Sequence, residues 1–329
     1  MENNRILVIG ACSQLGTGLT AALRDKYGRY HVIAADRVPA ADILLDVLNY
    51  EDLEQIIKEC GITEIYLLDN VVTETGKNNQ QAAWNLNVRG LLSVLELAVK
   101  YKLQKVFWPS STAVFGPGSP KYNCPQETRI QPNTVYGISK RTGEYWCNYY
   151  FEQFGLDVRS IRFPGLFVNS GSPGNDITGY AADMVNHALV QQPYTCYLSE
   201  DNCLPLMYQP DAVRATVELM DARITNISIR TSYNIAGMSF APCDLAAQIR
   251  KHIPGFRISY TPDHRNAIAN SQPAGIRDDQ ARKDWGWKPA YNLENMINEV
   301  LSGQSAQNHA PVSTYNKPKV QEFFPHETF

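Results

Sequence analysis

Short apolar runs alternate with longer amphipathic stretches through the first half of the chain. The apolar runs, rich in Val, Ile and Leu, predict strands at residues 5–9, 30–36, 42–45, 64–69, 105–110 and 158–163. The amphipathic stretches predict helices at about residues 16–27, 51–60, 80–101 and 134–155. Such alternation is typical of βαβ units, and strands with few polar positions are expected where helices cover both faces of a sheet. The pattern therefore predicts an α/β fold built on a Rossmann-like doubly wound parallel sheet.

The pattern changes after Pro164. Residues 165–178 form a polar stretch that is too long for a simple connector, and loops of this length often carry function. Beyond it the spacing predicts a helix at about 178–191, a strand–turn region to about 208, a helix opened by Pro210-Asp211, a strand at 232–236 and helices at about 242–252, 278–284 and 292–302. We expect a larger domain of residues 1–165 and 205–238, a smaller C-terminal domain of residues 166–204 and 239–302, and a polar tail of residues 303–329.

The composition is that of an ordinary globular protein. The 329 residues are 44% hydrophobic and 19% charged, which fits about two domains. The net charge of −3 argues against a nucleic-acid partner, because binding to phosphates needs a clustered basic face. No apolar run reaches the roughly 20 residues that a bilayer crossing requires, so no membrane association is expected either.

The cysteines and histidines bear on the compartment and on metal binding. The seven cysteines are scattered and never spaced as CxxC, and the six histidines form no HxxxH pair. A disulfide framework and a zinc site are therefore not expected. The first five residues run straight into an apolar strand, so no leader peptide is expected. These features predict a cytoplasmic protein with reduced thiols and no bound metal.

A glycine-rich turn, GACSQLG at residues 10–16, separates the first predicted strand from the first predicted helix. A bound pyrophosphate needs glycine where its oxygens approach the backbone, and it accepts hydrogen bonds from the free N–H groups of a helix N-terminus. The motif alone also fits an ordinary strand–helix turn. The candidate phosphate-binding residues are Gly10, Ser13, Gln14, Leu15 and Gly16.

Acidic residues at the ends of the next strands strengthen the dinucleotide interpretation. Asp36 closes the second predicted strand, where a carboxylate can hydrogen-bond the adenosine ribose hydroxyls and so favours NAD over NADP. Arg37, the next residue, weakens that preference slightly because an arginine there can accept a 2′-phosphate. Asp46 and Val47, after the third strand, are expected to hold the adenine edge.

The sequence YGISK places Tyr136 and Lys140 one helical turn apart, and therefore on one helix face. An ammonium beside a phenol favours the phenolate, which makes Tyr136 a candidate general base. The spacing also occurs at Tyr101/Lys105, across a helix end, and at Tyr315/Lys319, which encloses a proline. Only Tyr136 and Lys140 fall in a helix that follows a strand of the predicted sheet.

Hydroxyl side chains follow the fifth predicted strand in the run PSSTAVFG at residues 109–116. Ligands of open α/β sheets bind beyond the carboxyl ends of the strands, so a hydroxyl here faces the expected crevice. Ser111 is a candidate for stabilising charge on a substrate oxygen, and Thr112 is a candidate substrate contact. Each residue alone also fits a capped turn.

Together these motifs resemble the extended short-chain dehydrogenase/reductases, over about residues 4–302. The chain is similar, more narrowly, to the short-chain type of L-threonine 3-dehydrogenase, a metal-independent NAD enzyme. The stretches that carry this likeness are residues 107–117, 132–140, 158–165, 232–240 and 281–289. The last of them contains Asp-Trp-Gly-Trp-Lys at 284–288, which is specific to that subfamily.

This resemblance implies oxidation of the 3-hydroxyl of L-threonine by NAD, with 2-amino-3-oxobutanoate and NADH as products. It implies that Tyr136 is the base, that Lys140 tunes Tyr136 and holds the nicotinamide ribose, and that Ser111 orients the hydroxyl. It assigns Asn87 a structural and proton-relay position, although Asn87 also fits a residue that only satisfies local backbone groups. Further ligand contacts implied by the resemblance are Asp69 and Pro164 for the cofactor and Thr73, Thr178 and Gln272 for the substrate.

The chain departs from the subfamily close to the expected ligands. Ser13 replaces the middle glycine of the first turn, which is free of strain only if its φ is negative. Asp69 replaces a small apolar residue and is expected to repel the cofactor phosphates. Gln272 replaces an aromatic residue of the pocket lid. These changes bear on affinity, on lid closure and on the choice of substrate.

Three other functions remain open from the sequence. The enzyme alternatives are a dehydrogenase of another 3-hydroxy amino acid and a nucleotide-sugar 4-epimerase or dehydratase, which shares the fold and the Ser, Tyr and Lys. The alternative without catalysis is an NAD-binding protein with an altered site. The assembly is expected to be either a homodimer, through the helices at about 80–101 and 134–155, or a monomer in which the tail covers that surface.

Overall fold

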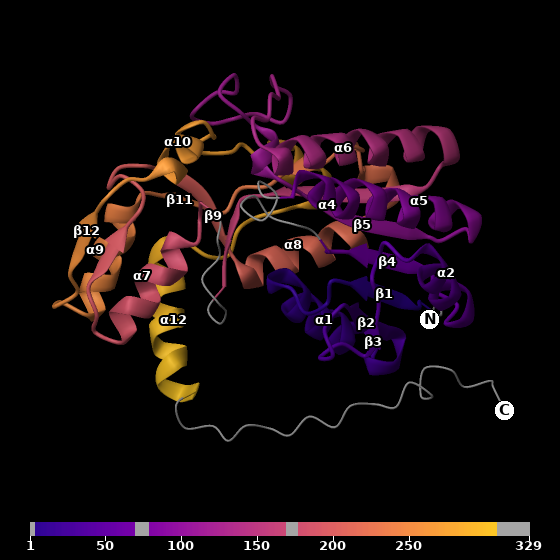
Figure 1. The fold of residues 1–329 in the computed structure, drawn as a ribbon, viewed down its shortest axis with the longest axis horizontal. Coiled ribbons are helices and arrows are strands. Elements are labelled where there is room, and N and C mark those ends of the chain that lie inside the picture. Colours follow the sequence, from indigo (N-terminus) through magenta and orange to yellow (C-terminus); the bar gives the residue numbers. More distant parts are fainter. Residues whose placement is uncertain (1–3, 70–78, 169–176, 308–329) are drawn as a thin grey trace.

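A computed structural model describes residues 4–69, 79–168 and 177–307, with side chains up to residue 302. A seven-stranded sheet lies at its centre, in the order β10-β6-β5-β4-β1-β2-β3 (Figure 1). All of its neighbouring strands are parallel. The strands are β1 (Ile6–Ile9), β2 (Val32–Asp36), β3 (Ile43–Leu44), β4 (Glu64–Leu67), β5 (Lys105–Ser111), β6 (Asp157–Phe163) and β10 (Tyr233–Asn234). The predicted Rossmann-like doubly wound sheet is confirmed.

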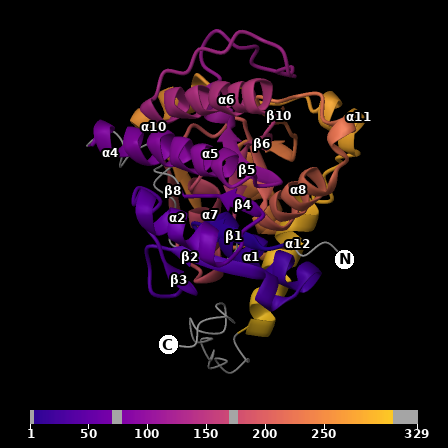
Figure 2. The ribbon, with the colours of Figure 1, turned by 90° about the vertical axis from the view of Figure 1, so that its right-hand side faces the viewer.

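Helices cover both faces of this sheet, and alternate residues of β1 show how the two faces divide. Leu7 and Ile9 lie in a buried cluster with α2 (Tyr50–Glu59), α5 (Gly90–Lys100) and α6 (Val135–Phe154). Ile6 and Val8 lie in a second cluster with α1 (Gln14–Tyr27) and α8 (Gln209–Asp221). Successive side chains of a strand point to opposite faces, so a strand buried on both sides is apolar throughout. Figure 2 shows α5 and α6 together on one face of the sheet.

A smaller region with its own buried cluster adjoins the carboxyl ends of β5 and β6. It contains a three-stranded sheet, β11-β9-β7, and a two-stranded sheet, β12-β8. Its strands are β7 (Gly165–Phe167), β8 (Tyr194–Cys196), β9 (Leu204–Tyr208), β11 (Met238–Phe240) and β12 (Ile258–Tyr260). Its helices are α7 (Tyr180–Leu189), α9 (Pro242–His252), α10 (His264–Asn270) and α12 (Leu293–Gln307), while α11 (Asp279–Trp285) lies against β10. Strand β9 serves both regions, since Met207 packs in the core of the large sheet and Leu206 in that of the small region.

Several predicted elements differ from the structure in extent. The helix expected at about 80–101 is interrupted by a π-helical turn, Asn85–Arg89, between α4 (Gln80–Trp84) and α5. The polar stretch expected at 165–178 begins with strand β7, and the last helix, expected at about 292–302, runs from Leu293 to Gln307. The short elements α10, β11 and β12 were not predicted. Among residues 4–69, 79–168 and 177–307, no helix is both long enough and apolar enough to cross a membrane.

Candidate active site

The carboxyl end of β5 and the first turn of α6 are packed tightly together. After β5 ends at Ser111, residues Thr112–Val114 form a 3₁₀ turn that rests on the start of α6. A Cβ added to Gly137 would lie 2.1 Å from the carbonyl oxygen of Ala113, so a glycine is needed for this approach. The contact brings Ser111 and Tyr136 to the same end of the sheet.

Lys140 lies on the same face of α6 as Tyr136, as the spacing predicted. Its Nζ lies 5.6 Å from the centroid of the Tyr136 ring and 4.5 Å from that of the Trp108 ring. The ammonium also donates a 2.7 Å hydrogen bond to the carbonyl oxygen of Pro109. Burial lowers the pKa of Lys140 to about 7, while the negative charges of the Asp69 and Glu144 carboxylates act in the opposite direction. Lys140 therefore releases its proton more readily than an exposed lysine does.

Below Tyr136 and Lys140 lies a buried ion pair that the sequence analysis missed. Glu144, one turn after Lys140 on α6, binds the Arg162 guanidinium of β6 through both carboxylate oxygens, at 2.7 and 2.9 Å. Both residues are almost completely buried. Ser110 donates to the same carboxylate at 2.7 Å, and Arg162 donates to Asn234 of β10 at 3.0 Å. This cluster joins β5, β6, β10 and α6, and so fixes Ser111 relative to Tyr136.

The sequence does contain a signal for this buried pair. Arg162 falls within β6, a strand of the parallel sheet in which every residue is buried. Charged residues are almost never fully buried without a partner, so its position required an acidic side chain on a neighbouring element. The spacing along the chain does not reveal that Glu144 is that partner.

The glycine-rich turn has the backbone geometry that a bound pyrophosphate requires. Gly10 has a φ of +79°, and a Cβ there would lie 2.6 Å from the backbone nitrogen of Asp69. A Cβ on Gly16 would lie 2.3 Å from the carbonyl oxygen of Gly10, so glycine at position 16 lets α1 approach β1. At both positions an added side chain would collide with neighbouring backbone, so glycine keeps the turn open. We call this turn, residues 10–16, the phosphate cradle.

Ser13 fits this turn without strain. Its φ is −71°, in a region open to any residue, and its hydroxyl accepts a 3.1 Å hydrogen bond from the N–H of Gly16 as the N-cap of α1. The N–H groups of Gln14 and Leu15, in the first turn of α1, have no helical carbonyl to bind and can serve an anion. The replacement of the middle glycine is therefore compatible with phosphate binding.

Asp36 and Arg37 lie beside the turn at the end of β2. The Asp36 carboxylate accepts hydrogen bonds from the N–H of Cys12 at 2.9 Å and from the N–H of Arg37 at 2.7 Å. The Arg37 guanidinium lies 3.6 Å from the carboxylate of Asp69, which follows β4. The charge of Asp69, expected to repel the cofactor, is thus partly neutralised by Arg37.

The other candidate cofactor residues have mixed surroundings. Val47 is fully buried against Gly90, so its side chain belongs to the core, while Asp46 is exposed and its carboxylate caps the N–H of Leu48 at 3.0 Å. Pro164 is buried between β6 and β7. The Asp46 carboxylate is thus open to solvent, whereas the side chains of Val47 and Pro164 lie in the interior.

Asn87 lies in the π-helical turn and is buried. It donates a 3.0 Å hydrogen bond to the hydroxyl of Ser139, which in turn donates to the carbonyl oxygen of Tyr136 at 2.8 Å. A π turn adds one residue to the helix, and such turns are frequent at functional sites. Asn87 therefore supports the first turn of α6 instead of satisfying only local backbone groups.

The candidate substrate residues are not all brought together. Thr112 is buried in the 3₁₀ turn, and Thr178, before α7, is buried against Gly165, where an added Cβ would lie 2.3 Å from its methyl carbon. The carbonyl oxygen of Gln272 accepts a 3.0 Å hydrogen bond from Lys121. Thr73 lies outside the described residues. Of the described candidates, Ser111 and Thr112 belong to the segment that packs on the first turn of α6, where Tyr136 lies.

The segment that carries Gln272 is tied to the loop between Ser111 and Tyr136. Ala274 donates to the carbonyl oxygen of Lys121 at 2.6 Å, and Cys124 donates to that of Gly275 at 2.9 Å. An isolated parallel bridge joins Cys124 to Ile276. The expected lid is thus attached to the β5–α6 connection, so movement of one segment would be transmitted to the other.

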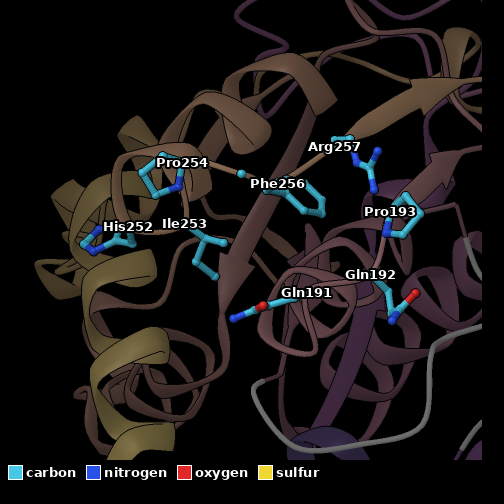
Figure 3. A pocket seen from close by; sticks show the side chains of 9 residues that line it. Gln191, Gln192, Pro193, His252, Ile253, Pro254, Phe256 and Arg257 are labelled. Atoms are coloured by element: carbon cyan, nitrogen blue, oxygen red, sulfur yellow. The ribbon is translucent and has the colours of Figure 1, made fainter.

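A separate pocket of about 450 Å³ lies in the smaller region (Figure 3). It is lined by residues 191–193 at the end of α7 and residues 252–257 after α9. None of the candidate site residues lines it. Within residues 4–69, 79–168 and 177–307, no group of three or more His, Cys, Asp or Glu side chains is placed to hold a metal ion.

Known proteins resemble this chain in both sequence and fold. The profile of the NAD dependent epimerase/dehydratase family matches residues 6–236. The holo form of an L-threonine dehydrogenase from Cupriavidus necator is 48% identical, with a TM-score of 0.90 over 91% of this chain and 99% of that one. A mitochondrial L-threonine 3-dehydrogenase of Bos taurus is 36% identical over 92% of this chain and 83% of its own length. An uncharacterized epimerase/dehydratase of Staphylococcus haemolyticus is 39% identical over 90% of this chain and 96% of its own.

Proposed function

This chain belongs to the NAD dependent epimerase/dehydratase family and, within it, to the short-chain L-threonine 3-dehydrogenases, and we propose that it oxidises the 3-hydroxyl of L-threonine with NAD. The products are 2-amino-3-oxobutanoate and NADH. The observation that carries the proposal is the placement of Ser111, Tyr136 and Lys140 at one end of the sheet, beside the Gly10–Gly16 cradle.

The proton of the threonine hydroxyl passes to the phenolic oxygen of Tyr136. The Lys140 ammonium, 5.6 Å from the ring centroid, stabilises negative charge on that oxygen. The Ser111 oxygen accepts a hydrogen bond from the N–H of Ala113 at 3.1 Å, which leaves its own O–H to donate to the substrate oxygen. NAD, when bound, supplies the acceptor for the hydride that leaves C3.

The residues of the nucleotide groove fit NAD. The N–H groups of Gln14 and Leu15 would bind the pyrophosphate, and Gly10 and Gly16 would leave room for its oxygens. Asp36 would accept hydrogen bonds from the adenosine ribose hydroxyls. Further contacts of the cofactor are assigned to Ser13, Arg37, Asp46, Val47, Asp69, Asn87, Lys140 and Pro164, and those of the substrate to Thr73, Thr112, Thr178 and Gln272.

The test is NADH formation, followed by absorbance, from NAD and L-threonine, with L-allo-threonine and L-serine as competing substrates. We expect turnover of threonine that falls by on the order of 10³-fold in Tyr136→Phe, since general base catalysis contributes about 10²–10⁴-fold. Tyr101 is the other described tyrosine that lies four residues before a lysine. Tyr101→Phe is therefore the matched control and should keep full activity.

A protein that binds NAD but reduces none of it with any amino acid would contradict the proposal. Such a result would favour a nucleotide-sugar 4-epimerase or dehydratase, or an NAD-binding protein without catalysis. Faster turnover of another 3-hydroxy amino acid would keep the reaction and change the substrate.

We further propose that two copies associate through the outer face of α6. Tyr145, Tyr149 and Phe154 are 60%, 46% and 53% exposed, although aromatic side chains of this size are normally covered. Sedimentation of the full chain should give a dimer, and Tyr149→Glu should give a monomer. A monomeric full chain that dimerises after removal of residues 308–329 would instead indicate that the tail covers this face.

A cytoplasmic location is proposed on the basis of the thiols. The seven cysteines form no disulfide in the structure, which fits a reducing compartment. Fractionation of the source cells tests this directly, and recovery from an oxidising compartment would contradict it.

A further inference from the structure

An ion pair crosses the end of strand β1 at the nucleotide groove. The Arg37 side chain starts after β2, and Asp69 follows β4, while β1 lies between these two strands in the sheet. The guanidinium of Arg37 lies 3.6 Å from the Asp69 carboxylate. Because Gly10 follows β1 and packs against the backbone of Asp69, the pair extends across the position of the phosphate cradle.

The two partners differ in how freely they can move. The Arg37 side chain is 52% exposed, whereas that of Asp69 is 15% exposed. The backbone of Arg37 is fixed, since its N–H donates to Asp36 at 2.7 Å. Removal of the Asp69 charge would therefore release the guanidinium to a new rotamer while the rest of the turn keeps its place.

The alternative position for this guanidinium is beside Asp36. An acid at the end of the second strand recognises the ribose hydroxyls of NAD, and a nearby arginine can accept the 2′-phosphate of NADP. This chain has both residues next to each other in sequence. Which dinucleotide is preferred then depends on where the Arg37 side chain is held.

We propose that Asp69 determines cofactor selectivity by drawing the Arg37 guanidinium across Gly10 and away from the 2′-phosphate position beside Asp36. This inference rests on the proposed function, because it assumes that the groove binds a dinucleotide. Asp69 acts here as a positioning residue through Arg37. Because Asp69 holds the Arg37 guanidinium, no cation lies beside Asp36, and the Asp36 carboxylate repels a 2′-phosphate.

Asp69 has a second electrostatic effect that must be separated from the first. Its negative charge raises the pKa of Lys140 against the lowering caused by burial. That effect acts at the nicotinamide end and changes the binding of NAD and NADP alike. The ratio of their dissociation constants therefore reports on Arg37 and the 2′-phosphate alone.

The experiment measures binding of NAD and NADP by titration calorimetry, in the absence of any amino acid. The variants are Asp69→Asn, Arg37→Ala and the double substitution, and Asp25→Asn, an exposed acid on α1, is the control for net charge. Adenosine 2′,5′-bisphosphate and 5′-AMP repeat the comparison for the adenosine end only. Asp69→Ala gives the same measurement if the asparagine variant does not fold.

We expect Asp69→Asn to shift the binding ratio toward NADP by on the order of 5-fold, the scale of an exposed ion pair. The shift should vanish in the double variant and be absent in Asp25→Asn. An unchanged ratio in Asp69→Asn, or a shift that persists without Arg37, would overturn the inference while NAD binding still supports the proposed function. A wild-type chain that binds neither dinucleotide would overturn both.

Discussion

Two ion pairs at the carboxyl end of the sheet differ in almost every physical respect. Glu144 and Arg162 are almost completely buried, joined by two short hydrogen bonds and linked to Ser110 and Asn234. Arg37 and Asp69 are separated by 3.6 Å, and half of the arginine side chain is in solvent. The buried pair fixes the chemistry of Ser111, Tyr136 and Lys140, whereas the exposed pair lies where the choice between two cofactors can be adjusted.

The difference follows from desolvation. A buried charge that loses its partner retains the full cost of leaving water, typically about 3–5 kcal/mol. An exposed pair contributes about 0–1 kcal/mol, because water replaces a lost partner. Residues that must hold a catalytic geometry therefore gain from burial, and residues that tune affinity can be exchanged without loss of the fold.

The largest effect is expected for the buried pair. Arg162→Met leaves the Glu144 carboxylate without its main partner in the core, and should lower the free energy of unfolding by about 3–5 kcal/mol. Denaturant unfolding measures this loss. The double variant Glu144→Met/Arg162→Met should recover most of it, because both fully buried charges are removed, and Arg141, the other ion-pair partner of Glu144, is 22% exposed and can reach water. A loss below about 1 kcal/mol in Arg162→Met would show that the pair is not desolvated.

The next largest effect is expected for the buried Lys140, which makes the free energy of unfolding depend on pH. The pKa of Lys140 is lowered from its ordinary value of 10.5 to about 7 by burial. Between these values the unfolded chain keeps the proton and the folded chain releases it, so the folded state gains stability as pH rises and loses it as pH falls toward 7. Lys140→Met removes this dependence.

The measurement is the unfolding free energy of both proteins at pH 7 and pH 9. Relative to Lys140→Met, the wild-type chain should gain about 2 kcal/mol over this interval, from about 1.4 kcal/mol for each full proton and pH unit. A constant difference between the two proteins would mean that Lys140 titrates alike in the folded and unfolded states.

The contact between the 3₁₀ turn and α6 gives an intermediate effect. Gly137→Ala places a Cβ 2.1 Å from the carbonyl oxygen of Ala113, which is backbone and cannot rotate away. Overpacking of this kind costs about 1–3 kcal/mol and should move Ser111 away from Tyr136, so kcat falls together with stability. Gly255→Ala is the matched control, since a Cβ there has no neighbour within 4 Å. Equal behaviour of the two variants would contradict the tight contact.

The smallest effect is expected for the exposed pair. Arg37→Ala should change the free energy of unfolding by less than about 1 kcal/mol, and the change should shrink further at high salt. Thermal unfolding at low and high ionic strength measures it. A loss as large as that of Arg162→Met would remove the distinction between the two ion pairs.

The sequence predicted most strands and helices of the large sheet, because their apolar residues follow the spacing expected of buried strands and amphipathic helices. It missed the π turn at Asn85–Arg89, since one extra residue does not disturb the apolar spacing of the flanking helices. The strands β7, β11 and β12, of three residues each, were also missed. They form only because tertiary neighbours complete their sheets.

The candidate site shows the same limit. Tyr136 and Lys140 were predicted to share a face because their relation lies within one helix. Glu144 and Arg162 pair across different elements, and so do Arg37 and Asp69. Asp69 and Arg37 were each noticed for their charge, but their mutual neutralisation depends on β4 and β2 flanking β1, which only the folded sheet establishes.

The measurement that tests the central claim most directly uses L-threonine carrying deuterium at C3 with unlabelled NAD. Oxidation of the 3-hydroxyl predicts that the deuterium appears in the reduced cofactor, and that transfer is lost in Tyr136→Phe, while cofactor binding remains. Reduced cofactor without deuterium, or release of the label into water, would contradict direct hydride transfer from C3 and with it the assigned roles of Ser111, Tyr136 and Lys140.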